Sequence, residues 1–381
     1  RRSRQLTTRH TEEGLPMVVR WIVAVAAFLV VAYIGIVGFG NFATGIDEEV
    51  FYDIEGANSF ALILAIALIV GFVVYAVVEY VQTRSLASIS RQFDTRTIVL
   101  MPLAIAINIV LGAAVANALK IPIYLDSIGT ILVGVLAGPI PGALTGFLSN
   151  MLWTYVVPPP FNSGAAAAFA IVAAVIGLGA GLVGRAGWLR PRPNRPTGQL
   201  LTGAVITVGV IALMAYLSFL GYTAIIGDSG ISVENDNVAF VILGWLALAL
   251  VVLTVLGLLY MLFARRDLTA SYVVIAGLGM GIVAALISAP ISANLFSGVT
   301  GAGTDFLVAA FRQAGTDIGN ATLGQGLISD PIDKITTFFV VYLILSAMAT
   351  RTKAGFPQGE RLIDGDETVE DDAGEWRGAP A

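Results

Sequence analysis

Residues 127–184, SIGTILVGVLAGPIPGALTGFLSNMLWTYVVPPPFNSGAAAAFAIVAAVIGLGAGLVG, contain no charged side chain and decide the fold. A helix that crosses the hydrocarbon of a bilayer needs roughly 20 apolar residues, so this run is too long for one span. Gly-Pro and Pro-Gly pairs interrupt it within 138–142, and three prolines interrupt it at 158–160. Because proline removes a helical donor and clashes with the preceding turn, we expect three spans, over 126–138, 139–156 and 165–184.

The composition of the whole chain is that of an all-α membrane protein. Of its 381 residues, 57% are hydrophobic and only 12% are charged, against about 25% charged in an ordinary soluble domain. This excludes a soluble globular protein and a disordered chain. The apolar runs are continuous and lack the alternation of an outer-membrane barrel. With no Cys and a single His, His10, the chain also lacks the residues of thiol chemistry and of most transition-metal sites.

The remaining uncharged apolar runs extend the same pattern along the chain. They cover 21–41, 57–78, 97–119, 196–227, 237–264, 268–304 and 335–350. The expected total is about ten transmembrane segments. Basic residues favour the cytoplasmic ends of spans, and this topology puts all 21 Lys and Arg residues on that side except Lys120, Arg312 and Lys334. We therefore predict a multi-pass protein of the cell membrane with both termini in the cytoplasm.

Polar residues near the spans gather in two stretches, 121–162 and 290–334, which the predicted topology places at the outer face. Ionisable groups beside apolar segments are functional candidates. The two stretches therefore predict an outward-facing pocket for a small polar or amphipathic molecule. Its candidate ligand-binding residues are Tyr124, Asp126, Asn150, Trp153, Asn162, Asn294, Asp305, Arg312, Asp333 and Lys334.

Several of these polar residues also have a purely structural interpretation. Asp330-Pro331 is typical of a helix N-terminus and predicts that the last span starts near Asp333. Lys334 could pair with a nearby carboxylate, and Asn150 could make an interhelical hydrogen bond. The aromatic residues of the first stretch could belong to an interfacial belt. These alternatives remain open beside ligand binding.

Residues 304–314 have the pattern of one or two amphipathic helical turns that lie near the interface. Glycine-rich segments flank them at 298–303 and 319–326. Glycine gives the backbone conformational freedom and permits close approach. We therefore expect these flanks to form a loop that closes over a ligand.

Small residues recur at helical spacing in the span that begins near residue 97. The pairs are Gly112 with Ala116 and Ala114 with Ala118. This small-xxx-small spacing lets another helix approach closely. All four residues are candidates for docking a partner helix.

The stretch YLDSIGTILVGVLAGPIPGALTGFLSN, residues 124–150, resembles the substrate-binding S component of energy-coupling factor (ECF) vitamin transporters. FSGVTGAGTD (296–305) and SDPIDK (329–334) resemble the distal part of some members. The resemblance implies a six-helix core that captures a vitamin or related micronutrient from outside. It also implies a transmembrane coupling subunit and two cytoplasmic ATPases as partners, besides the lipid bilayer. It implies no catalysis, cofactor, metal or nucleic acid.

This resemblance divides the chain into five parts. Residues 1–97 form the cytoplasmic N-terminus and two extra spans, and residues 98–184 form the first part of the core. An inserted hairpin of two more spans follows at 185–267, and the second part of the core covers 268–353. Residues 354–381 form an acidic, disordered cytoplasmic tail. The four extra helices depart from the family pattern. They put the usual packing against a coupling subunit in doubt. A secondary transporter and a membrane sensor domain remain alternative hypotheses, and a membrane enzyme is the least favoured.

Overall fold

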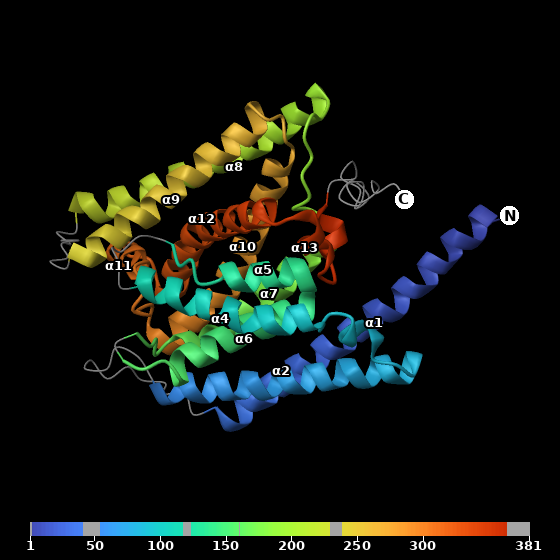
Figure 1. Ribbon diagram of the computed structural model, residues 1–381. Helices are drawn as coiled ribbons and strands as arrows, with labels where there is room; N and C mark the ends of the chain where they lie inside the picture. Colours follow the sequence, from blue (N-terminus) through green and yellow to red (C-terminus); the bar gives the residue numbers. More distant parts are fainter. Residues whose placement is uncertain (1, 41–53, 117–122, 160, 229–237, 364–381) are drawn as a thin grey trace, which may run out of the picture. The chain divides into compact units, whose positions relative to one another are not determined.

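The computed structural model describes residues 2–40, 54–116, 123–159, 161–228 and 238–363, and these contain helices and no strands (Figure 1). Six helices in this described part are long and apolar enough to cross a membrane. They cover Met17–Phe39, Glu55–Thr83, Thr95–Ala114, Ala166–Arg185, Thr197–Phe219 and Thr269–Phe296. The predicted class, an all-α membrane protein, is therefore confirmed.

The chain forms two compact units, Arg1–Gln92 and Phe93–Ala381, which we call the N-terminal unit and the core unit. In the N-terminal unit, helix α1 (Arg2–Phe39) pairs with α2 (Ile54–Thr83), and the short α3 (Ala87–Ser90) follows. The buried Arg20 guanidinium lies 3.5 Å from the Glu79 carboxylate. That carboxylate also accepts hydrogen bonds from the backbone N–H and the hydroxyl of Ser88, both at 2.7 Å.

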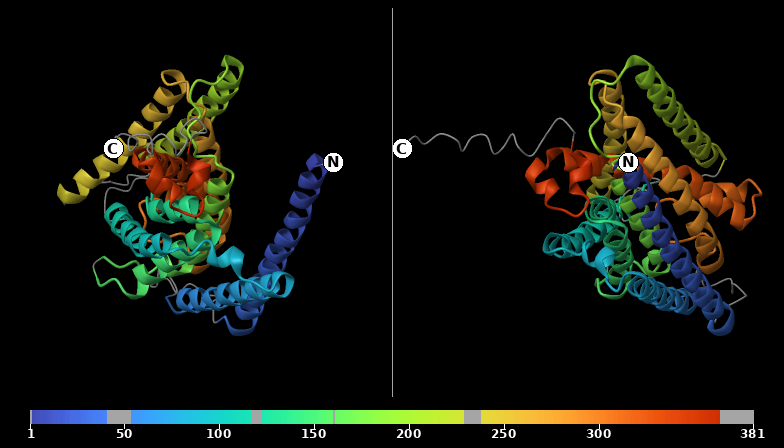
Figure 2. Two further views of the ribbon diagram at one scale, coloured as in Figure 1. Left: turned by 45° about the vertical axis from the view of Figure 1, so that its right-hand side comes forward. Right: turned by 90° about the vertical axis from the view of Figure 1, so that its right-hand side faces the viewer.

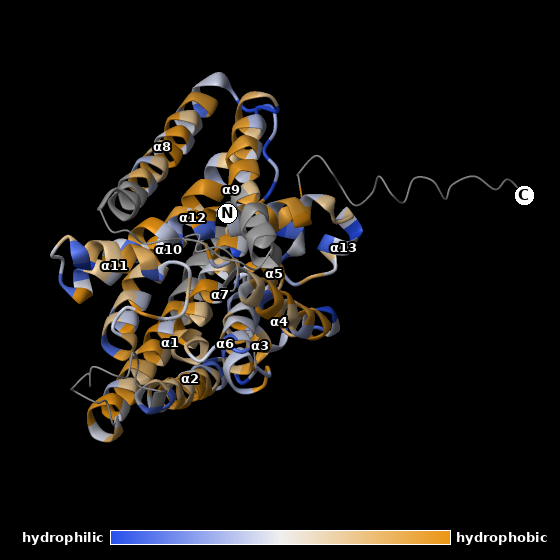
Figure 3. Ribbon diagram, turned by 90° about the vertical axis from the view of Figure 1, so that its left-hand side faces the viewer, coloured by the Kyte–Doolittle hydropathy of each residue, from blue (hydrophilic) through white to orange (hydrophobic). Residues whose placement is uncertain are grey.

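The core unit contains all the remaining described helices. They are α4 (Thr95–Ala116), α5 (Ile128–Ala137), α6 (Pro139–Tyr155), α7 (Ala170–Arg185), α8 (Thr197–Asp228), α9 (Val238–Phe263), α10 (Thr269–Phe296), α11 (Asp305–Gln313), α12 (Ile318–Ala347), α13 (Thr350–Ala354) and the 3₁₀ turns η1 (Ala166–Phe169) and η2 (Gly359–Leu362). Helices α4 to α7 pack together, α10 pairs with α12, and the predicted inserted hairpin, α8 and α9, packs on α10 and α12 (Figures 1 and 2). Hydrophobic residues run along α8 and α10, whereas hydrophilic residues gather around α11 and α13 (Figure 3).

The two predicted breaks in the long uncharged run are confirmed. Helix α5 ends at Ala137, and α6 begins at Pro139, where proline needs no helical partner for its nitrogen. Gly138 between them has a φ of 131°, which a residue with a side chain rarely adopts. Helix α6 then ends at Tyr155, just before the three prolines.

Helix α12 corrects the expectation for the last span. It begins at Ile318, where the Asp317 carboxylate accepts a hydrogen bond from the Asn320 N–H at 3.0 Å, and Pro331 lies inside it. The predicted helix start at Asp330-Pro331 is therefore wrong, and the glycine-rich flank 319–326 is helical rather than a loop. A neighbouring helix can accommodate a proline within a span. Here the backbone of α10 approaches Pro331 closely at Gly281. A Cβ on Gly281 would lie only 2.4 Å from the Pro331 Cα, so glycine is what permits this contact.

The beginning of the predicted tail is folded. The Gln358 N–H donates to the Leu136 carbonyl at 2.8 Å, and the Arg361 guanidinium donates to the Arg185 carbonyl. Leu362 is buried with 1% exposure. The expectation that disorder begins at 354 is therefore wrong for 354–363, because apolar side chains of this segment pack against the helix ends. The rest of the predicted tail lies outside the described residues.

Candidate functional site

The core unit contains a cavity of about 160 Å³. It lies between the last turns of α4, α6 and α10, the first turns of α5 and α7, and the middle of α12. Its walls combine aromatic and small apolar residues with a limited set of polar side chains. The polar and charged lining consists of Tyr124, Asp126, Ser127, Asn150, Ser163, Ser288, Ser292, Thr300, Gln325, Asp330 and Lys334. Five of the ten predicted ligand-binding residues, Tyr124, Asp126, Asn150, Trp153 and Lys334, therefore meet at one cavity.

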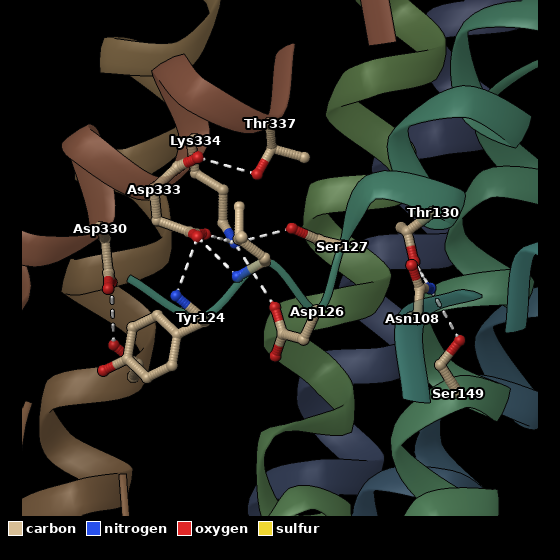
Figure 4. Close-up of polar contacts among 12 residues, drawn as sticks. Asn108, Tyr124, Asp126, Ser127, Thr130, Ser149, Asp330, Asp333, Lys334 and Thr337 are labelled. Carbon is tan, nitrogen blue, oxygen red and sulfur yellow. Dashed lines mark hydrogen bonds and ion pairs between the residues drawn. The ribbon is translucent and has the colours of Figure 1, made fainter. Parts of the chain in front are cut away.

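Residues 123–127, which precede α5 and form part of the cavity wall, are called the wall segment, and Asp333 fixes its backbone. This fully buried carboxylate accepts hydrogen bonds from the backbone N–H groups of Tyr124, at 2.9 Å, and Leu125, at 2.8 Å (Figure 4). Leu125 has a φ of 54°, a left-handed conformation that costs on the order of 1–3 kcal/mol in a residue with a side chain. Asp333 does not line the cavity. It instead fixes the backbone that presents Tyr124 and Asp126.

Lys334 is buried among oxygen acceptors (Figure 4). Its Nζ lies 2.5 Å from the Asp333 carboxylate, 2.8 Å from the Ser127 hydroxyl and 3.8 Å from the Asp126 carboxylate. Charges buried in protein are normally paired in this way. The structural interpretation of Lys334, pairing with a nearby carboxylate, is therefore confirmed, and the same ammonium group also forms part of the cavity wall.

Tyr124 ties the wall segment to two other parts of the site. Its hydroxyl lies 2.8 Å from the Thr304 hydroxyl and accepts a hydrogen bond from the Gln325 amide at 3.2 Å. The same amide nitrogen donates to the Ser329 hydroxyl at 2.6 Å. The phenol is therefore held in place by α12 and by the residue that precedes α11.

Asp305, at the start of α11, shapes the loop that covers one side of the cavity. Its carboxylate accepts hydrogen bonds from the Thr300 N–H and hydroxyl, both at 2.9 Å, and from the Gly301 N–H at 2.8 Å. Burial raises the pKa of Asp305, and these hydrogen bonds only partly offset that rise. Thr300 and Gly301 line the cavity, whereas Asp305 supports them from behind.

Asn150 and Trp153 lie one helical turn apart at the end of α6. The Trp153 indole donates to the Phe161 carbonyl at 2.8 Å. The Asn150 side chain is 6% exposed, lines the cavity and makes no hydrogen bond with any residue in the described part of the chain. The interhelical hydrogen bond considered for Asn150 is therefore not found among these residues. Its amide remains available to a ligand, as both donor and acceptor.

Asp330 is a cavity residue that the sequence analysis assigned to a helix terminus. It is 5% exposed, and its nearest hydroxyl groups, on Ser329 and Ser288, lie 3.4 and 3.5 Å away. Within the described residues, no Lys or Arg nitrogen comes within 4 Å of its carboxylate. An ionisable group inside an apolar span was the signal that could have identified it.

The hydrogen-bond network around Asn108 of α4 was also not predicted from the sequence. Its amide donates to the Thr130 hydroxyl of α5 at 2.8 Å and to the Ser149 hydroxyl of α6 at 2.9 Å, and its oxygen accepts from the Gly129 N–H at 2.7 Å (Figure 4). Asn108, Thr130 and Ser149 are all buried. This network connects the three helices directly beside the cavity wall.

Three predicted ligand-binding residues, Asn162, Asn294 and Arg312, are exposed and do not line the cavity. The Asn294 amide donates to the carbonyl of Pro290, and the Arg312 guanidinium donates to the carbonyl of Thr316. The α10 wall residues Ser288 and Ser292 are one turn apart. Asn294 lies two positions further on, which turns it to the other side of the helix.

The predicted docking residues have different surroundings. Gly112 is buried and lines the cavity, and a Cβ there would lie 2.6 Å from the Trp153 ring. The close approach that Gly112 permits is therefore to a side chain of the same chain. Ala114 is half-buried, and the side chain of Ala116 and the whole of Ala118 lie outside the described residues.

The site offers several kinds of group to a ligand. They are two carboxylates, one ammonium group, the Asn150 amide and the rings of Tyr124, Trp153 and Phe169. An apolar cavity of about 150 Å³ can hold a benzene-sized molecule, so this one suits a single ring. In the part of the chain that the structure describes, no cluster of three or more Asp, Glu, His or Cys residues could hold a metal ion.

Comparisons of the chain with protein-family models, with curated proteins and with solved structures find no match. The candidate site therefore rests on the geometry of the cavity and of the residues that form it.

Proposed function

We propose that this chain is the substrate-capture subunit of an ATP-driven uptake transporter, similar to an ECF S component. In this proposal about ten transmembrane segments, with both termini in the cytoplasm, present the cavity to the outer face of the cell membrane. The ligand is a vitamin or related micronutrient. A transmembrane coupling subunit and cytoplasmic ATPases would supply the energy, and the chain itself would not be an enzyme.

The observation that carries this proposal is the cavity with Asn150 in its wall. Asn150 lines the cavity and makes no hydrogen bond with any residue in the described part of the chain. A side-chain amide can both donate and accept hydrogen bonds. A ligand in the cavity could therefore hydrogen-bond to it without displacing a protein partner. This favours a binding site over a packing defect.

The distribution of basic residues supports an outward-facing site. Four basic residues lie at the end of α7 that is remote from the cavity. Arg185 is the last residue of this helix, and Arg190, Arg192 and Arg195 follow it. Because basic residues favour the cytoplasmic side, the cavity belongs to the outer half of the membrane. A ligand would then enter from outside.

The test is to identify the bound molecule and to measure how single substitutions change its affinity. Native mass spectrometry of the purified full chain should detect a co-purified small molecule, and a binding assay with that molecule should give its affinity. Asn150→Ala should weaken binding by about tenfold or more. Asn294→Ala is the matched control, because Asn294 is exposed and bonds only locally. Equal affinities of the two variants would contradict the assigned site.

A secondary transporter is the second candidate, and the ionisable residues of α12 favour it. Asp330, Asp333 and Lys334 are buried within one helix of the core unit, and such groups mark ion and proton pathways in many transporters. Reconstitution in vesicles distinguishes the two candidates. Uptake driven by an ion gradient without ATPases supports secondary transport. Uptake that requires ATP and co-purified ATPase subunits supports the capture subunit.

A further inference from the structure

The charges at the cavity do not balance. Lys334 is the one cation in the cavity wall, among the described residues, and its Nζ lies 2.5 Å from Asp333, behind the wall. Asp126 is further away, at 3.8 Å from the same ammonium group. Asp330 has no cation within 4 Å in the described part of the chain. When Asp126, Asp330, Asp333 and Lys334 are all ionised, three negative groups face one positive group, and the site carries an excess of negative charge.

The neutral part of the wall is aromatic on more than one side. Tyr124 precedes α5, Trp153 ends α6, and Phe169 precedes α7 and stacks on Phe296 with ring centroids 5.7 Å apart. Each ring presents a π face or edge to its surroundings, and aromatic faces attract cations. Carboxylates and aromatic rings together are the groups that recognise an organic cation.

We propose that the ligand of this cavity is a small organic cation with a single ring, whose positive group lies beside Asp330. This inference rests on the proposed capture function and specifies its substrate class. Asp330 has hydroxyl groups at 3.4 and 3.5 Å but no cation within 4 Å among the described residues. A buried carboxylate without a cationic partner is unfavourable, and the ligand would supply the missing positive charge. The volume of about 160 Å³ leaves room for one ring and its charged substituent.

Three probes of similar size test the charge preference. Benzylammonium, benzyl alcohol and benzoate share one ring and differ in the charge of the substituent. Their binding to the full chain in lipid nanodiscs is measured by calorimetry. Benzylammonium should bind at least about tenfold more tightly than benzyl alcohol, since a hydrogen bond to a charged group exceeds a neutral one by that amount. Benzoate should bind most weakly.

Asp330→Asn provides the residue-level test. Asn has nearly the same shape and removes only the negative charge, so the preference for benzylammonium should fall by about tenfold. Asp317→Asn is the matched control, because Asp317 is an exposed cap of the same helix and Asn also caps helices. It should leave the preference unchanged.

Three results would overturn the charge assignment. The first is that benzyl alcohol or benzoate binds as tightly as benzylammonium or more tightly. The second is that Asp330→Asn keeps the full preference for benzylammonium, and the third is that benzylammonium does not bind at concentrations up to millimolar. The capture function fails separately. If a neutral or anionic molecule co-purifies and Asn150→Ala weakens its binding, capture stands and only the charge inference fails.

Discussion

At the scale of single residues, Asp333 connects the charge network of α12 to the backbone of the cavity wall. We predict that Asp333→Ala lowers the free energy of unfolding by about 3–5 kcal/mol, because it leaves Lys334 without its nearest partner and two backbone N–H groups without an acceptor. Chemical unfolding in mixed micelles measures this change.

The control for this prediction removes the stranded cation as well. Asp333→Ala combined with Lys334→Met should recover part of the lost stability, since no unpaired charge remains. A double variant as unstable as the sum of two independent changes would contradict the pairing.

The Asp305 carboxyl gives a prediction about pH. Burial raises its pKa in the folded chain, so the folded state holds this proton more tightly than the unfolded state. The resulting stability is present below the ordinary Asp pKa of about 4 and is lost as pH rises through the raised pKa. Thermal unfolding of wild type relative to Asp305→Asn should therefore show falling relative stability as pH increases. A rise with pH would contradict the burial of this carboxyl.

How far the site was predictable from the sequence differs from residue to residue. Asn150 and Lys334 were recognisable as polar groups in apolar surroundings. Asp330 was misassigned because Asp-Pro is a strong local signal for a helix start, and the packing of α10 against Pro331 outweighs it. The partners of Asn108 lie 22 and 41 positions away, and no local pattern encodes pairs so distant.

At the scale of helices, α10 and α12 approach each other through glycine. A Cβ on Gly281 would lie 2.4 Å from the Pro331 Cα. We predict that Gly281→Ala destabilises the chain by about 1–3 kcal/mol through overpacking. Gly279→Ala on the same helix is the control, because nothing lies within 4 Å of a Cβ there. That change should be neutral or stabilising by up to about 1 kcal/mol. Similar effects of the two substitutions on thermal stability would contradict the close approach.

The helices themselves followed from the sequence more closely than the site did. The break between α5 and α6 was predictable because Gly138 and Pro139 act locally on the backbone. The start of α12 was not, because Asp317 caps a helix whose first turns carry glycine and polar residues, a composition that also fits a loop.

At the scale of the whole molecule, the segment 354–363 belongs to the fold of the core unit. We predict that truncation after Lys353 lowers the free energy of unfolding by about 3 kcal/mol or more, because it removes the buried side chains of Leu362 and Ile363. Truncation after Ile363 is the control, since it keeps every described contact. Equal thermal stability of the two truncated chains would show that the segment contributes nothing.

The shortness of α5 has an electrical consequence. The cavity lies at the beginning of this helix, its last turn bonds to Gln358, and its 10 residues extend only about 15 Å. The hydrocarbon of a bilayer is about 30 Å thick, so a ligand in the cavity would face a barrier of about half that depth. The membrane voltage acts on any charge that crosses such a barrier, by at most about 2.3 kcal/mol per elementary charge and 100 mV. In the proposed orientation, with the cavity facing outward, a negative cell interior would therefore assist the inward release of a cationic ligand and oppose its escape.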